Sequence, residues 1–159
     1  MKIRLATEND VETIAQLWYE LVTYHQTLTD DMPKPAPDGV ERYAQRIRYG
    51  LSDSYLKTFV AEIDEKIVGY VFGSVIDLLP ETFVAENAGL IGDLYVQDAY
   101  RGMGVGSALM QAMKDWFKLR GVNHYEWYVA ASNEIGVNFW QKTMHGKPIM
   151  MRMRASVDE

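Results

Sequence analysis

The sequence lacks cysteine altogether, and it contains few histidines for its 159 residues. The absence of cysteine excludes disulfides, cysteine nucleophiles and thiolate metal sites, and it suits a reducing compartment such as the cytoplasm. The histidines at positions 25, 124 and 145 share no spacing typical of a metal site or a catalytic triad, so no metal is expected. No window approaches the roughly 20 apolar residues of a membrane span, and the N-terminus lacks the apolar stretch of a signal peptide.

An excess of positive charge is also missing. The formal net charge of −6 at pH 7 argues against general binding to nucleic acid and is compatible with a cationic small substrate. Apolar residues make up 48% of the chain, a value typical of a globular protein. No repeat, low-complexity tract or linker interrupts the sequence, so residues 1–159 are expected to form a single domain.

The most informative stretch runs from Tyr100 to Leu109 and reads YRGMGVGSAL. An apolar run from Leu90 to Val96 precedes it, and apolar residues at helical spacing follow it from Val105 to Phe117. A strand therefore leads through a glycine-rich loop into a helix, where free backbone N–H groups and the helix dipole favour an anion. Arg101 adds a positive charge, so the expected ligand is a phosphate or pyrophosphate.

Two common phosphate-binding motifs do not fit this loop. A Walker A motif requires Gly-Lys-Ser/Thr, but Gly106 is followed directly by Ser107. The dinucleotide-binding fingerprint requires Gly-x-Gly-x-x-Gly in an early βαβ unit, whereas these glycines lie two residues apart and far along the chain. The pattern that remains is Arg-x-x-Gly-x-Gly, and the alternative interpretation is a purely structural turn.

Periodicity predicts an α/β (α+β) fold with the element order β-α-α-β-β-β-α-β-α-β. Thr7 is expected to cap the first helix, with Asp10 as a capping-box partner. A run of antiparallel strands precedes one parallel pair, strands four and five, joined by the helix after the glycine loop. Strands are expected at 2–6, 55–63, 67–78, 88–96, 124–130 and 148–154, and helices after Thr7, at 40–50, at 105–120 and from Asn133.

The loop resembles motif A of the GCN5-related N-acetyltransferases (GNAT), which holds the pyrophosphate of acetyl-coenzyme A. A second stretch supports the resemblance: Asn133, Gly136 and the pair Phe139–Trp140 match the family's asparagine, small residue and aromatic pair. The resemblance implies the GNAT fold, a mixed and mostly antiparallel sheet in which strands four and five are parallel and splayed. In motif detail, residues 93–96 and 133–134 are most similar to the diamine and polyamine acetyltransferases.

The same resemblance implies a site for acetyl-coenzyme A, and no metal. The pantetheine arm would pair with the strand-four backbone like an added strand, and the Val96 N–H would point towards the thioester carbonyl. The alternative is that this backbone merely completes a sheet ladder. The implied cofactor-binding residues are Leu94, Tyr95, Val96, Arg101, Gly102, Met103, Gly104, Val105, Gly106, Ser107, Asn133, Gly136 and Trp140.

The sequence departs from the family at two catalytic positions, so Trp140 and Asp93 are the candidate catalytic residues. Trp140 stands where the family usually has a tyrosine assigned to protonate the departing thiolate. Its indole N–H can only donate a hydrogen bond, and the alternative is that it simply packs. Some members carry a glutamate base just before an aspartate on strand four, and the matching positions here are Gly92 and Asp93.

Regular alternation would place Gly92 on one face of the strand and Asp93 on the other, together with Ile91 and Tyr95. Asp93 is therefore expected to be structural, bonding to a neighbouring loop, rather than a replacement for the glutamate. Other candidates for the base are Glu62, Asp77, Tyr128 or a chain of waters.

The resemblance implies an enzyme, an acetyl-coenzyme A-dependent N-acetyltransferase that acts directly on a primary amine of a small molecule, for example a polyamine or diamine. One alternative is a non-catalytic acyl-coenzyme A binding or sensor module. Another is an acetyltransferase acting on a protein or peptide amine. The resemblance, together with the apolar alternation of Ile149, Met151 and Met153, further predicts a homodimer. Neither a nucleic-acid partner nor a membrane is expected.

Overall fold

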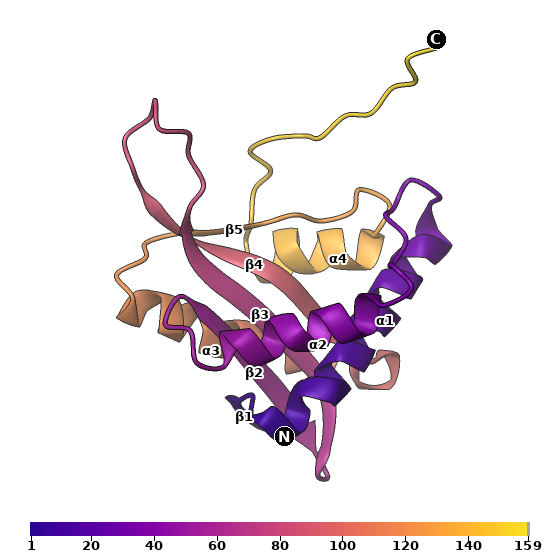
Figure 1. The fold of residues 1–159 in the computed structure, drawn as a ribbon, viewed down its shortest axis with the longest axis vertical. Coiled ribbons are helices and arrows are strands. Elements are labelled where there is room, and N and C mark those ends of the chain that lie inside the picture. The colour runs from indigo at the N-terminus through magenta and orange to yellow at the C-terminus, as the bar shows by residue number, and fades with distance from the viewer. Residues whose placement is uncertain (159) are drawn as a thin grey trace. The chain divides into compact units, whose positions relative to one another are not determined.

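The computed structural model describes residues 1–158, and its strands form one mixed sheet with the order β1-β2-β3-β4-β5 (Figure 1). Neighbouring strands are antiparallel from β1 to β4, and β4 and β5 are parallel. This arrangement confirms the predicted fold class. The strands are β1 (Lys2–Leu5), β2 (Leu56–Ile63), β3 (Lys66–Asp77), β4 (Asn87–Val96) and β5 (Tyr125–Trp127). The α-helices are α1 (Val11–Leu28), α2 (Gly39–Gly50), α3 (Val105–Leu119) and α4 (Glu134–Asn138).

The chain divides into two compact units, residues 1–128 and the residues from Val129 onward. The first unit holds the whole sheet and helices α1 to α3. The second holds α4 and a short π-helix, Phe139–Thr143. The prediction of a single domain stays a prediction.

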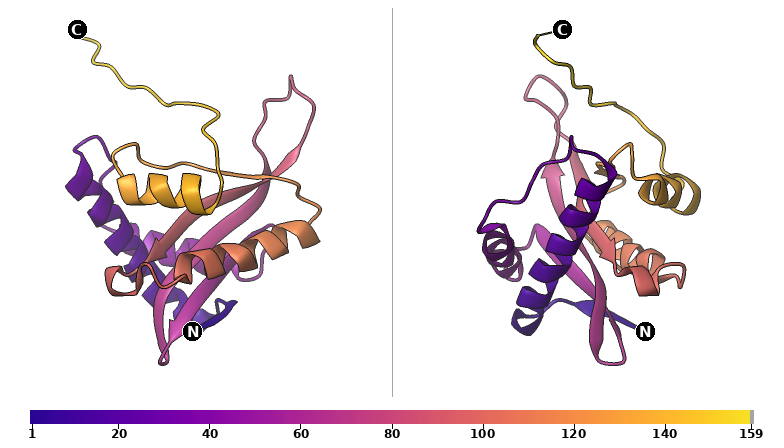
Figure 2. Two further views of the ribbon diagram at one scale, coloured as in Figure 1. Left: turned by 180° about the vertical axis from the view of Figure 1, so that it is seen from behind. Right: turned by 90° about the vertical axis from the view of Figure 1, so that its right-hand side faces the viewer.

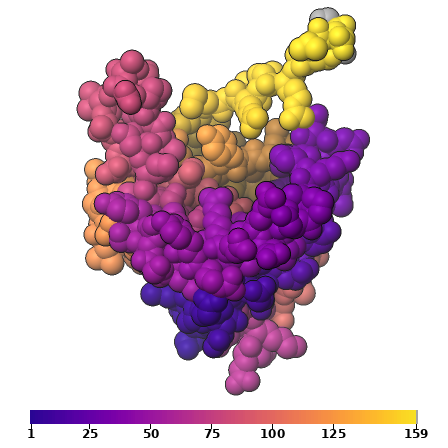
Figure 3. Space-filling view, in the orientation of Figure 1, coloured from indigo at the N-terminus to yellow at the C-terminus, as the bar shows by residue number. Residues whose placement is uncertain are grey.

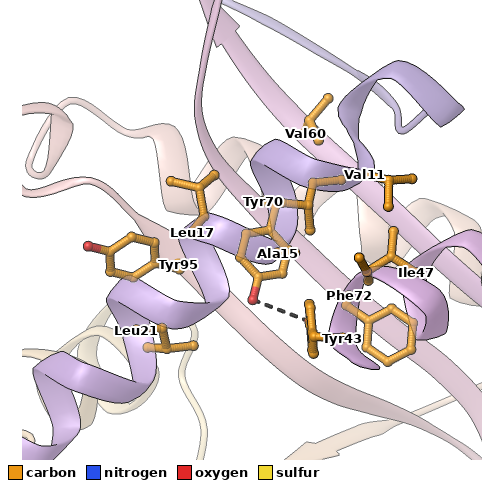
Figure 4. Close-up of a cluster of buried hydrophobic side chains, with 12 residues drawn as sticks. Val11, Ala15, Leu17, Leu21, Tyr43, Ile47, Val60, Tyr70, Phe72 and Tyr95 are labelled. Carbon is orange, nitrogen blue, oxygen red and sulfur yellow. Dashed lines mark hydrogen bonds between the residues drawn. The ribbon is translucent and has the colours of Figure 1, made fainter. Parts of the chain in front are cut away.

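In the first unit, α1 and α2 cover one face of the sheet and α3 covers the other (Figures 1 and 2). The space-filling view shows α1 and α2, in indigo and purple, over the face turned to the viewer (Figure 3). Under these two helices lies a core of aliphatic and aromatic side chains (Figure 4). Its members include Val11, Ile14, Leu17, Tyr43, Ile47, Val60, Tyr70, Phe72 and Tyr95.

Thr7 caps a 3-10 turn, Glu8–Asp10, and Asp10 is the N-cap of α1, so the predicted cap lies one short turn before the helix that it was assigned to. As predicted, Thr7 and Asp10 are partners: the Thr7 N–H and hydroxyl donate to Asp10 Oδ2 at 2.7 and 2.8 Å. The Arg4 guanidinium of β1 donates to both oxygens of Asp10 at 2.6 and 2.9 Å, and it also donates to Glu62 of β2 at 2.9 Å. The entry of α1 is therefore held by charged hydrogen bonds from Arg4 of β1, which is itself bound to β2.

On the opposite face, α3 lies close to the sheet because two strand positions are glycine. A Cβ atom on Gly89 would lie 2.6 Å from the Phe117 ring, and one on Gly73 would lie 2.9 Å from the end of Met113. Real Cβ atoms do not approach other atoms so closely, so these glycines set the distance between α3 and strands β3 and β4.

Two of the expected strands differ from the structure. The fifth was predicted to run to Ala130 but is only the three residues of β5. The predicted last strand, 148–154, is wrong: the described residues there form no strand, and Met150, Met151 and Met153 are each 82% exposed. A segment whose apolar residues alternate only weakly, and which has no neighbouring strand to pair with, does not form a strand. The homodimer stays a prediction. No helix within residues 1–158 is long and apolar enough to span a bilayer.

Candidate functional site

A β-bulge interrupts β4 at Gly92. Along the β3–β4 ladder, Gly73 pairs with Ile91 and Phe72 pairs with Asp93, so Gly92 has no partner residue on β3. An extra residue of this kind breaks the regular alternation of side chains. A Cβ atom on Gly92 would lie 2.8 Å from Cδ1 of Phe72, which is a member of the core under α1 and α2.

The bulge corrects the predicted orientation of Asp93. Residues paired across a ladder share a face, so Ile91 faces α3 together with Gly73, while Asp93 faces α1 and α2 together with Phe72. Asp93 and Ile91 therefore lie on opposite faces, although alternation had placed them together. Gly92 and Asp93 both adjoin Phe72, so Asp93 lies on the face towards which a side chain at position 92 would point.

The Asp93 carboxylate contacts helix α2 and not a loop, contrary to the prediction. The Tyr43 hydroxyl donates to Asp93 Oδ2 at 2.8 Å. The Tyr43 and Tyr70 oxygens lie 3.2 Å apart (Figure 4). Burial raises the pKa of Asp93, while the hydrogen bond from Tyr43 and the positive charge of Arg46 lower it, and the net pKa lies above the ordinary value. A carboxylate with a raised pKa at a strand irregularity has the properties of a proton acceptor.

The other candidate bases have different surroundings. Glu62 is paired with Arg4 at 2.9 Å. Asp77 accepts from the Leu79 N–H at 2.9 Å at the exposed end of β3. Tyr128 is 87% exposed after the end of β5. None of these three is buried beside the bulge. Among residues 1–158, no three histidine or carboxylate side chains are grouped so that they could hold a metal ion.

The glycine-rich loop has a backbone that requires glycine at two positions. Gly102 and Gly104 have φ values of 74° and 79°, in the left-handed region, and no other atom lies within 4 Å of where their Cβ atoms would be. The surface above the loop is therefore open. Gly104 is the N-cap of α3, and no side chain caps this helix end, so its first N–H groups are available to an anion.

The side chain of Arg101 is used within the protein. Its Nε donates to the Val96 carbonyl at 3.0 Å, and Nη1 donates to Asp98 at 2.9 Å. The guanidinium also lies over the rings of Tyr24 on α1 and Tyr95 on β4, at 5.2 and 5.7 Å from their centroids. Arg101 thus ties the loop to β4 and α1, a role that the sequence did not indicate. A contact between Arg101 and a pyrophosphate stays a prediction.

The last part of β4 presents backbone groups on its side away from β3. The parallel ladder with β5 ends at the pair Ile91–Trp127, although β4 continues to Val96. The Gln97 N–H donates to Val68 of β3 at 2.9 Å. Because successive residues of a strand direct their backbone groups to opposite sides, the N–H of Val96 points away from β3. This backbone does not merely complete the described ladder, as one interpretation of the sequence proposed.

These observations fit acetyl-coenzyme A, the group implied by the resemblance. Its pyrophosphate needs free N–H groups at an open helix start, and the loop between Arg101 and Ser107 provides them. Its pantetheine amides need unpaired strand backbone, and the residues from Leu94 to Val96 lie beyond the ladder with β5. The roles of Met103, Val105 and Gly106 in such a site stay predictions.

The second motif lies in the second unit and forms a local structure of its own. Asn133 is the N-cap of α4, and its side-chain oxygen accepts from the Gly136 N–H at 3.0 Å. A Cβ atom on Gly136 would lie 2.7 Å from Asn133 Nδ2, which explains the small residue at this position. Trp140 lies in the π-helix, is 8% exposed, and packs edge-on against Phe139 at 5.1 Å. A catalytic role for Trp140 stays a prediction.

Comparisons with known proteins agree with this geometry. Residues 21–145 match the Acetyltransferase (GNAT) family. An uncharacterized N-acetyltransferase of Methanocaldococcus jannaschii is 31% identical over 85 residues, which cover 53% of this chain and 49% of that protein. The chain thus spans about half the length of this curated relative.

Solved structures share the fold. A mutant of the BH1408 protein from Bacillus halodurans has a TM-score of 0.86 at 22% identity, covering 99% of each chain. A predicted acetyltransferase from Clostridium acetobutylicum, solved with acetyl-CoA, has a TM-score of 0.76 at 15% identity, covering 98% of this chain and 96% of that one. An aminoglycoside 6'-N-acetyltransferase from Acinetobacter haemolyticus has a TM-score of 0.75 at 15% identity, covering 98% and 97%. With the glycine loop, the bulged β4 and the family match over residues 21–145, the chain belongs to the GNAT family of acetyltransferases.

Proposed function

We propose that this protein is an acetyl-coenzyme A-dependent N-acetyltransferase that acts on a primary amine of a small molecule. The proposal rests on the arrangement of residues along β4. This strand carries Asp93 at its bulge, directs the Leu94 backbone and the Val96 N–H away from β3 beyond the ladder with β5, and leads into the open glycine loop. Acetyl-coenzyme A supplies the activated acetyl thioester when it is bound.

Asp93 removes a proton from the incoming ammonium group in this proposal. A protonated amine has no free electron pair, so it must lose a proton before it can attack a carbonyl carbon. A C–N bond then forms, the C–S bond breaks, and the sulfur leaves with the electron pair of that bond. The products are an amide, the coenzyme A thiol or thiolate, and the protons released by the nitrogen. No enzyme nucleophile is needed, and no cysteine is available for that purpose.

The backbone of β4 and of the loop binds and orients the donor. The Val96 N–H, directed away from β3, stabilises negative charge on the thioester oxygen, and the Arg101 side chain fixes the carbonyl of the same residue. The N–H groups at the start of α3 hold the pyrophosphate. Roles for Asn133 and Trp140 at the cofactor stay predictions from the family resemblance.

A small cationic acceptor suits the acidic character of the chain, whose net charge is −6. One of the solved structures with a similar fold is an aminoglycoside 6'-N-acetyltransferase. Aminoglycosides are therefore as good a candidate as the polyamines and diamines suggested by the sequence.

A coenzyme A thiol-release assay tests the proposal. Spermidine, putrescine, kanamycin, free amino acids and a lysine-containing peptide serve as acceptors, each at saturating acetyl-coenzyme A. We expect turnover with at least one small amine, and we expect Asp93→Asn to abolish it while coenzyme A binding, measured by calorimetry, is unchanged. Tight binding of coenzyme A without turnover of any amine would instead select the non-catalytic module. Turnover of the peptide alone would select a protein acceptor.

A further inference from the structure

Two buried tyrosines form a chain of contacts that ends on the Asp93 carboxylate. The Tyr43 hydroxyl donates to Asp93 Oδ2 at 2.8 Å and lies 3.2 Å from the Tyr70 oxygen. A phenol carries a single proton, so when Tyr43 donates to Asp93, Tyr70 must donate to the Tyr43 oxygen for both contacts to be hydrogen bonds. The chain of donors then runs from β3 through α2 to β4 and ends on one carboxylate oxygen.

The phenol of Tyr43 is itself fixed on several sides. Its ring stacks on the indole of Trp18 from α1, with centroids 4.8 Å apart and planes at 9°. The Tyr70 ring meets it edge-on at 6.4 Å (Figure 4). Tyr43 and Tyr70 are 6% and 0% exposed. A donor held this firmly loses little further freedom when it hydrogen-bonds, so it can orient a partner at low entropic cost.

We infer that Tyr43 is a positioning residue of the proposed acetyl-transfer reaction: its hydroxyl holds the Asp93 carboxylate beside the bulge of β4, oriented to accept the proton of the amine. The inference rests on the proposed function. Tyr43 donates to Oδ2, so Oδ1 keeps its full capacity to accept this proton.

The groups that face Asp93 predict the direction in which its pKa shifts when one of them is removed. They are Tyr43 and Arg46 from α2 and Tyr70 from β3. Burial raises the pKa of Asp93, and the bond from Tyr43 is the larger of the two effects that lower it. Loss of the Tyr43 hydroxyl must therefore raise the pKa of Asp93 further, and loss of the Arg46 charge must raise it less.

The test uses Tyr43→Phe, with Tyr49→Phe as the matched control, because Tyr49 lies on the same helix and is 68% exposed. The first measurement is the titration of Asp93 in the ligand-free protein by carboxyl ¹³C NMR, assigned with Asp93→Asn. The second is the pH profile of kcat/KM with whichever acceptor from the panel is turned over. We expect Tyr43→Phe to move the Asp93 titration and the acid limb of the profile to higher pH. We also expect it to lower kcat about tenfold at neutral pH with the KM for acetyl-coenzyme A unchanged.

Tyr49→Phe should leave both measurements unchanged. Tyr70→Phe keeps the Tyr43–Asp93 bond, so it should shift the Asp93 titration and the pH profile in the same direction but by less. It replaces Tyr43→Phe in the test if that variant does not fold. If the natural protein turns over an acceptor but Asp93 titrates at the same pH in Tyr43→Phe as in the natural protein, the inference is overturned. Absence of turnover in the natural protein, with a moved titration, would overturn the proposed function and with it the catalytic part of the inference, but it would still confirm the contact.

Discussion

Replacement of Asp10 by Asn tests how much the charged cluster at the start of α1 stabilises the fold. Asp10 accepts two hydrogen bonds from Arg4, its side chain is 6% exposed, and the arginine lowers its pKa from 3.8 to about 2. At about 1.4 kcal/mol per pH unit, this difference corresponds to about 2.5 kcal/mol of folding free energy at neutral pH. Asn keeps an oxygen that can accept from Thr7, so the substitution removes mainly the charge.

The pH dependence follows from the sign of this change. A carboxylate with a lowered pKa stabilises the folded state above its unfolded pKa and loses that contribution as the pH falls through its folded pKa. The gap in unfolding free energy between the natural protein and Asp10→Asn should therefore be about 2.5 kcal/mol at pH 7 and about half of this at pH 3. The assay is urea unfolding followed by tryptophan fluorescence at both pH values.

The matched control for this substitution is Asp38→Asn. Its pair with Arg42 is exposed, with side chains 49% and 72% accessible, so its loss should cost less than about 0.5 kcal/mol. A negligible gap for Asp10→Asn at pH 7, or a gap of the same size at pH 3, would refute the reasoning.

Three further substitutions test the site and its support. Asp93→Asn should equal or exceed the natural protein in urea midpoint at pH 7, because a carboxyl with a raised pKa destabilises the fold once ionised; a clear loss of stability would contradict this. Gly104→Ala should weaken coenzyme A binding in calorimetry, whereas Gly121→Ala, with a similar φ of 72°, should cost similar stability but leave binding unchanged. Gly89→Ala should cost about 1–3 kcal/mol through the Phe117 ring, and Gly50→Ala much less.

Much of the fold could be predicted because local patterns and global structure agree. The hairpin of β2 and β3 was predicted from a short polar turn, and Asp64 and Glu65 do take φ values of 49° and 62° there. The glycine loop was predicted to open a helix, and Gly104 is indeed the N-cap of α3. The predicted strand 148–154 failed because strand formation depends on a pairing partner, which periodicity within one segment cannot reveal.

The site could be predicted only in part, because its geometry depends on contacts between distant segments. Tyr43 lies 50 residues from Asp93, and its place on an amphipathic helix looked like any other core position. Arg101 was predicted to bind a ligand because of its charge, but the contacts of its guanidinium with Val96 and Tyr24 were not predicted. No sequence pattern indicated where these side chains would point.

The packing of the core beside the bulge accounts for the glycine at position 92 of this chain. A side chain at position 92 would have to displace the Phe72 ring, whose Cδ1 lies 2.8 Å from the Cβ position. A glutamate there would also add a second negative charge beside Asp93, which already has its pKa raised by burial. With glycine at 92, Phe72 stays in the core and Tyr43 can hold Asp93. The glutamate of the family pattern is therefore absent at Gly92, and Asp93, at the position of that pattern's aspartate, is the carboxylate left at the bulge.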